Sequence, residues 1–211
     1  MTKEDLRTTC ASVCIAALAC VAFAAVTHGF AGVTSDALRR AGLAANPRVL
    51  PAIELVDSAG QRLSLRDYGR DPTRVTFVAL AYVRCTSVCL TSSSGQSWLQ
   101  AEIRARGLAD RVQLLTLSFD PFGDTPQVLE QHAKQLGADR ELWRFATVAD
   151  TRELPRLLDF FGTVVIPDDL GGYSHNAGLF FIGEDGRLSR AYDTARPDIA
   201  LAGYLQNHAN R

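Results

Sequence analysis

An uncharged apolar segment near the start of the chain is followed by a longer stretch in which short apolar and polar segments alternate. Residues 10–33 contain no charged side chain and are long enough to cross a bilayer as a helix. We therefore predict a transmembrane anchor at 10–33, preceded by a cytoplasmic tail at 1–9. A cleaved signal peptide with its apolar region at 11–21, a lipid-modified Cys20 and a buried core helix are the alternatives.

The remaining chain divides into a predicted tether at 34–49 and a folded domain at 50–211. Continuous apolar runs at 75–83 and 112–118 are typical of strands that are buried on both faces. Turn and capping signals predict further elements: a hairpin of 53–56 and 62–65, helices near 96–106, 125–136, 150–162 and 197–208, and a hairpin of 179–182 and 188–192. Strands that alternate with helices and end in a hairpin and a helix predict an α/β fold, a layered sheet of thioredoxin type.

Composition limits the classes of partner and metal site. With 21% charged residues and a formal net charge of -1, the chain offers no electrostatic argument for a nucleic-acid partner. The single methionine is residue 1, so a site for a soft metal has to use thiolate and imidazole ligands. Of the histidines, His132 and His208 are expected to be solvated surface residues.

Cys85 and Cys89 follow the predicted strand 75–83, where a helix begins. The carboxyl edge of an α/β sheet is the usual place for a binding site. A spacing of four puts both sulfurs on one face of the helix, and the helix N-terminus and Arg84 favour the thiolate form. The pair can therefore bind a metal or form a disulfide, and the two states exclude each other. Two inert buried cysteines and a purely structural disulfide are the alternatives.

Three motifs in order resemble the Sco/SenC family of thioredoxin-like copper chaperones, which serve the binuclear copper centre of cytochrome oxidase. They are YVRCTSVC, LLTLSFDPFGDTPQVLEQHAKQLG and GGYSHNAGLFFIGEDGRLSRAY. The resemblance covers about 50–208 and implies a thioredoxin-like three-layer sandwich behind a single N-terminal transmembrane helix. It implies that Cys85, Cys89 and His175 are the metal ligands. The acidic segment of the family falls on Asp120, Pro121, Asp124, Thr125 and Pro126.

The chain departs from the family pattern at two positions beside the ligands. Leu90 stands where the family usually has proline, and Ser174 stands where an aspartate commonly precedes the histidine. These departures concern the rigidity of the loop and the surroundings of the imidazole, and through them the choice of partner. Asp124 or Thr125 is predicted to cap the following helix, with a minor role near the site for Asp120 or Asp124.

Two thiolates and one imidazole suit Cu(I), and an added water or carboxylate accommodates Cu(II), whereas zinc normally takes four ligands. The resemblance therefore implies a metallochaperone rather than an enzyme, whose partners are the copper subunit of cytochrome oxidase or other copper chaperones. The expected location is the inner membrane, with 50–211 in the periplasm. The alternative is a thiol-disulfide oxidoreductase that uses Cys85 and Cys89 to reduce target cysteines for copper insertion. A thiol peroxidase assisted by Arg84 is a weaker third interpretation.

Overall fold

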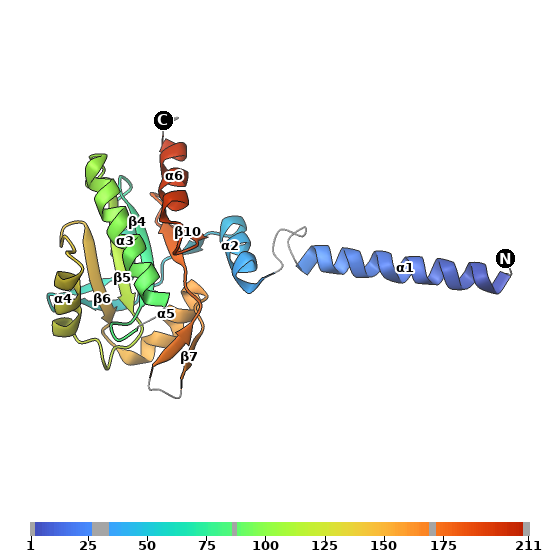
Figure 1. The fold of residues 1–211 in the computed structure, drawn as a ribbon, viewed down its shortest axis with the longest axis horizontal. Helices are drawn as coiled ribbons and strands as arrows, with labels where there is room; N and C mark the ends of the chain where they lie inside the picture. The colour runs from blue at the N-terminus through green and yellow to red at the C-terminus, as the bar shows by residue number, and fades with distance from the viewer. Residues whose placement is uncertain (1–2, 27–33, 86–87, 169–171, 209–211) are drawn as a thin grey trace. The chain divides into compact units, whose positions relative to one another are not determined.

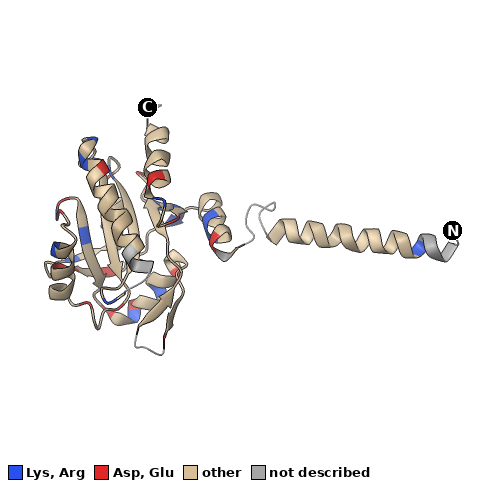
Figure 2. Cartoon of the chain, viewed as in Figure 1, with Lys and Arg blue, Asp and Glu red and all other residues tan. Residues whose placement is uncertain are grey.

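A computed structural model describes residues 3–26, 34–85, 88–168 and 172–208. The chain divides into two units, Met1–Ala45 and Asn46–Arg211. Helix α1 (Lys3–Val26) of the first unit contains an apolar stretch long enough to cross a membrane, with a mean hydropathy of 2.3. Figure 2 shows no charged residue in α1 after its N-terminal turns. An anchor and a signal sequence both fit this helix, and residues 27–33 of the predicted anchor lie outside the described residues.

The predicted tether contains a helix that the sequence analysis did not anticipate, α2 (Ser35–Ala45). The second unit begins just after it. Within the described residues its main sheet has eight strands in the order β1-β10-β9-β4-β5-β6-β2-β3. Their bounds are β1 (Arg48–Val49), β2 (Glu54–Asp57), β3 (Arg62–Ser64), β4 (Val75–Ala81), β5 (Val112–Ser118), β6 (Trp143–Val148), β9 (Leu179–Ile182) and β10 (Arg187–Tyr192).

Strands β4, β5 and β6 are parallel, while β9 pairs with β4 in the antiparallel direction. The two predicted apolar strands and both predicted hairpins are confirmed. The sequence analysis missed β6, because its segment WRFATV is short and interrupted by Arg144. It also missed a separate two-stranded sheet, β7 (Val165–Pro167) with β8 (Tyr173–His175), whose strands are only three residues each.

Helices cover both faces of the main sheet (Figure 1). Helices α3 (Val88–Ala105), α4 (Pro126–Gln135) and α6 (Pro197–His208) contribute to one apolar cluster that also contains Phe181 of β9. The neighbouring Phe180 points to the opposite face, since side chains alternate along a strand. There its ring lies 4.9 Å from that of Phe161, in α5 (Leu154–Phe161). The result is three layers, helix on sheet on helix, in agreement with the predicted class.

Local signals explain where the helices begin and end. The hydroxyl of Thr125 accepts the N–H of Val128, and Pro126 occupies the first turn of α4, as predicted. Gly162 ends α5 with φ of 63°, a conformation that favours glycine. Asp150 caps a short 3₁₀ segment, η2 (Thr151–Glu153), so the helix predicted from residue 150 begins in that tighter form.

The two histidines expected at the surface are half-buried instead. The His132 ring packs edge-on against Phe145, with ring centroids 5.9 Å apart, and burial lowers the pKa of His132. Nε2 of His208 lies 2.9 Å from a carboxylate oxygen of Glu184. The prediction of solvated histidines was wrong because both rings make tertiary contacts, His132 with Phe145 of β6 and His208 with Glu184.

Candidate metal centre

Three segments that carry the candidate residues leave the main sheet at one edge. The last residues of β4 and β5, Ala81 and Ser118, are paired, so the loops that follow these parallel strands start side by side. Strand β9 runs the other way and begins at Leu179 opposite Ala79. The segment that precedes β9, with His175, therefore reaches the same carboxyl edge of the sheet.

Cys85 is buried in the loop after β4, with 7% of its surface exposed. Its N–H donates to the carbonyl of Tyr82 at 3.3 Å, which closes a tight turn just before the helix. Helix α3 begins at Val88, so the backbone of Cys89 belongs to the first helical turn, whereas Cys85 lies in the loop before the helix and not on the helical face that the spacing argument assumed. The side chain of Cys89 lies outside the described residues. The juxtaposition of the two sulfurs therefore stays a prediction.

His175 is the last residue of β8 and is half-buried. Its Nδ1 lies 3.3 Å from the carbonyl oxygen of Asn176. Because a carbonyl oxygen only accepts, this contact is a hydrogen bond when Nδ1 carries the proton. Burial lowers the pKa of His175 and so favours the neutral imidazole that a metal needs.

An aromatic cluster links the histidine strand to the cysteine loop. The ring of Phe119 lies 4.9 Å from the imidazole of His175 and 5.3 Å from the ring of Tyr82. Tyr173, also in β8, packs edge-on against both Tyr82 and Phe119. Sequence reasoning missed this cluster, although its members lie within or beside the three quoted motifs.

Asp124 is fully buried and holds the loop before Cys85. Its Oδ2 accepts the N–H of Val83 at 3.0 Å and the hydroxyl of Ser118 at 2.5 Å. Burial raises the pKa of the Asp124 carboxyl, although these two hydrogen bonds act in the opposite direction. Asp124 is therefore not the helix cap that was one of the two predicted possibilities, since Thr125 has that role.

Arg84, which directly precedes Cys85, also interacts with a buried carboxylate. Its Nη2 lies 3.5 Å from Oδ2 of the buried Asp120, while the arginine side chain remains 69% exposed. The backbone N–H of Asp120 in turn donates to Ser118 Oγ at 3.0 Å. The carboxylate offsets part of the positive charge that was expected to favour the Cys85 thiolate.

Among the side chains that the structure describes, no three from His, Cys, Asp and Glu lie close enough together to hold a metal ion. The predicted trio of Cys85, Cys89 and His175 is not tested by this observation, because Cys89 is not among those side chains. The described part of the site contributes one thiol, one imidazole and the scaffold that holds them.

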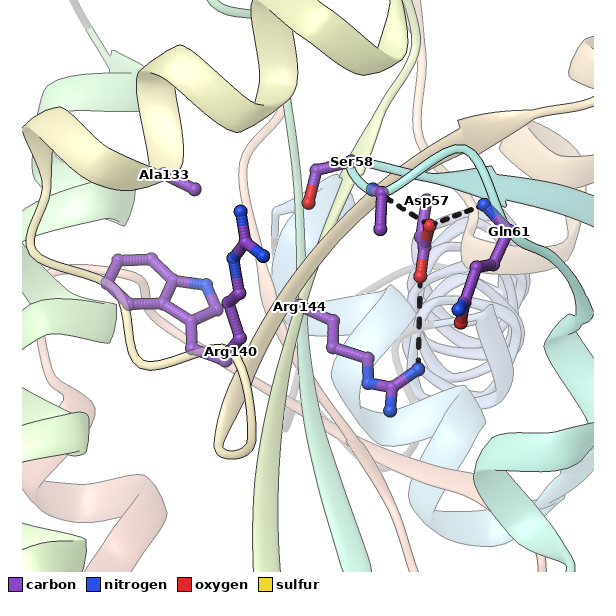
Figure 3. Close-up of a pocket in the computed structure, with 8 residues that line it drawn as sticks. Asp57, Ser58, Gln61, Ala133, Arg140 and Arg144 are labelled. Carbon is purple, nitrogen blue, oxygen red and sulfur yellow. Dashed lines mark hydrogen bonds and ion pairs between the residues drawn. The ribbon is translucent and has the colours of Figure 1, made fainter.

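A surface pocket lies at the opposite edge of the sheet, beside the first residues of β6 (Figure 3). One carboxylate oxygen of Asp57 accepts the N–H groups of Ala59 and Gln61, and the other lies 3.9 Å from Nη1 of Arg144. Asp57 thus stabilises the β2–β3 turn. Since β6 is parallel to β4, its first residues lie at the amino edge, away from Cys85 and His175.

Comparison with known proteins places this geometry in context. A family model described as SCO1/SenC matches residues 42–210 of this chain. The SCO1 protein homolog of Bacillus subtilis is 22% identical over 136 residues, which are 64% of this chain and 68% of that protein.

Two solved structures share the fold at low sequence identity. A SCO1/SenC family lipoprotein from Bacillus anthracis is 18% identical with a TM-score of 0.67, over 76% of this chain and 96% of that one. Bradyrhizobium japonicum ScoI with copper bound is 21% identical with a TM-score of 0.60, over 75% of this chain and 98% of that one. The predicted thioredoxin-like α/β fold is confirmed.

Proposed function

Because the chain belongs to the SCO1/SenC family, we propose that it is a copper-binding metallochaperone rather than an enzyme. The observation that carries the proposal is the convergence of the Cys85 loop and the His175 strand at one edge of the sheet. The aromatic contact between Phe119 and His175 joins the elements that follow β5 and precede β9. Copper is the cargo of this site, and Cys85, Cys89 and His175 are its ligands.

The chemistry of these donors suits copper in either oxidation state. Two thiolates alone hold Cu(I), and the imidazole of His175 supplies the nitrogen ligand that Cu(II) accepts readily. A relative of the same fold, Bradyrhizobium japonicum ScoI, has been solved with copper bound. Burial lowers the pKa of the half-buried His175, which favours the neutral imidazole that binds a metal.

The proposed recipient is the binuclear copper centre of cytochrome oxidase or another copper protein. Helix α1 is apolar over Arg7–Val26 and fits an inner-membrane anchor, with the domain on the periplasmic side. That compartment is oxidising, so the thiol pair would need a reductant before it could be loaded with copper. A chaperone at this surface would act beside membrane-bound oxidase subunits.

A thiol-disulfide oxidoreductase is the second candidate function. The observation that favours it is the position of Cys85 just before the N-terminus of α3, an arrangement that stabilises thiolates. Such an enzyme would reduce target cysteines before copper insertion and would not require His175. The histidine therefore separates the two functions.

The deciding experiment compares the affinities of wild type and His175→Ala for Cu(I) and Cu(II). A ligand role predicts that Cu(II) binds much more weakly to the variant and Cu(I) only moderately so, while the potential of the cysteine pair changes little. His208→Ala is the matched control, since His208 is half-buried on α6 against Glu184. Unchanged Cu(II) affinity in His175→Ala would remove this residue from the site and favour the oxidoreductase.

A further inference from the structure

Tyr82 contacts both elements that carry the proposed ligands. Its carbonyl accepts the N–H of Cys85 at 3.3 Å, and its hydroxyl accepts the N–H of Tyr173 at 3.1 Å. The side chain is buried, with 8% of the residue exposed, and its ring packs edge-on against that of Tyr173 at 5.2 Å. One residue therefore joins the loop after β4 to strand β8.

The β7–β8 hairpin depends on such contacts for its position. It pairs Val165 with His175 and Pro167 with Tyr173 in a sheet separate from the main one. A two-stranded sheet is marginally stable by itself, so packing against the rest of the domain has to fix its place. Tyr173 and His175 are two residues apart and project from the same face, and both rings pack on Phe119. A shift of Tyr173 therefore carries His175 with it.

The chain leaves room for this contact at Gly172. A Cβ at that position would lie 2.9 Å from the Tyr82 hydroxyl and 2.9 Å from Oδ2 of Asp168. The N–H of Gly172 also donates to Oδ1 of Asp168 at 2.7 Å. The absence of a side chain at residue 172 thus lets the hydroxyl approach the backbone of β8.

We propose that Tyr82 is a positioning residue that holds the imidazole of His175 in register with the cysteine loop, through its hydrogen bond to the backbone of β8. The inference rests on the proposed function, because it takes His175 as a ligand. It adds to the proposed site a residue that does not contact the metal but positions the nitrogen ligand, His175.

The test is Tyr82→Phe, which removes only the hydroxyl and keeps the ring in the cluster. In copper-free protein the Tyr173 amide should exchange with solvent faster, measured by hydrogen–deuterium exchange. Cu(II) affinity should fall about 3- to 10-fold with a changed Cu(II) visible or EPR spectrum, as expected for loss of one hydrogen bond. Cu(I) affinity should change by less than about 2-fold, since two thiolates suffice for Cu(I).

Tyr68→Phe is the matched control, because the Tyr68 hydroxyl is buried without a hydrogen-bond partner among the described residues and lies in the 3₁₀ segment η1 (Leu65–Gly69). It should leave the Tyr173 amide and Cu(II) binding at wild-type values. In a His175→Ala background, Tyr82→Phe should no longer affect Cu(II) affinity, since its effect passes through the imidazole.

Unchanged Tyr173 exchange in Tyr82→Phe, or an equal loss of Cu(II) affinity with and without His175, would overturn the inference. The proposed function fails by a different result, wild-type protein that binds no copper. In that case the exchange measurement, made without copper, still decides whether Tyr82 holds β8.

Discussion

Replacing Asp124 by alanine tests whether the buried carboxyl positions the cysteine loop or only stabilises the fold. The substitution removes the acceptor of two hydrogen bonds, from the Val83 N–H at 3.0 Å and from the Ser118 hydroxyl at 2.5 Å. Each such bond contributes about 1–2 kcal/mol net, while removal of a buried carboxyl relieves part of its desolvation cost. We expect the free energy of unfolding to fall by about 2–3 kcal/mol.

Asp57→Ala is a matched control at the other edge of the sheet. Asp57 is also a buried aspartate whose carboxylate accepts two backbone N–H groups, those of Ala59 and Gln61 (Figure 3). Its replacement should cost a comparable free energy of unfolding without moving the loop before Cys85. The comparison therefore separates loss of stability from loss of position.

The assay pairs urea unfolding with Cu(II) affinity for both variants and wild type. If the hydrogen bond from Val83 to Asp124 holds the cysteine loop in the conformation that binds metal, Asp124→Ala should weaken Cu(II) binding about 5- to 10-fold, the equivalent of about 1–1.4 kcal/mol. Asp57→Ala should bind Cu(II) as wild type does. Equal Cu(II) affinity in the two variants, at comparable loss of stability, would refute the positioning argument.

Three further predictions concern pH, redox state and topology. Burial raises the pKa of Asp124, and the Asp120 carboxylate adds to this rise while His132 opposes it. Below the ordinary carboxyl pKa, wild type should therefore gain stability relative to Asp124→Asn. This gain should be lost as pH rises through the folded-state pKa of Asp124. Unfolding free energies of both proteins across that range check this, and a difference that grows with pH would contradict it. Reduced protein should bind about one copper and the protein with a Cys85–Cys89 disulfide far less; metal analysis with the disulfide confirmed by mass tests this, and equal retention would exclude the thiols. A reporter that works only in the periplasm should be active when it is fused after Arg211, and a reporter that works only in the cytoplasm should not. Activity of the cytoplasmic reporter alone would contradict the proposed topology.

Local patterns were sufficient for the elements whose signals lie within a few residues. The apolar runs at 75–83 and 112–118 marked β4 and β5, because a strand buried on both faces has no polar alternation. The Thr125-Pro126 pair and Gly137, which has φ of 64°, marked both ends of α4. The candidate ligands were likewise readable, since the cysteine spacing and the three motifs are properties of the sequence.

The sequence alone determined the α/β class and the strand-to-helix position of the cysteines, because both depend on residue type and short spacing, and the resemblance of its three motifs to the Sco/SenC family implied the candidate ligand set. Only the tertiary structure decided how the His175 strand is held, since β7 and β8 are too short to give a periodic signal. It also showed that Asp124 accepts a hydrogen bond from the N–H of Val83 rather than capping a helix, and that the Tyr82 hydroxyl accepts one from the N–H of Tyr173. Such contacts join residues far apart in the chain, and they form because the segments that follow β4 and β5 and the segment that precedes the antiparallel β9 meet at one edge of the sheet.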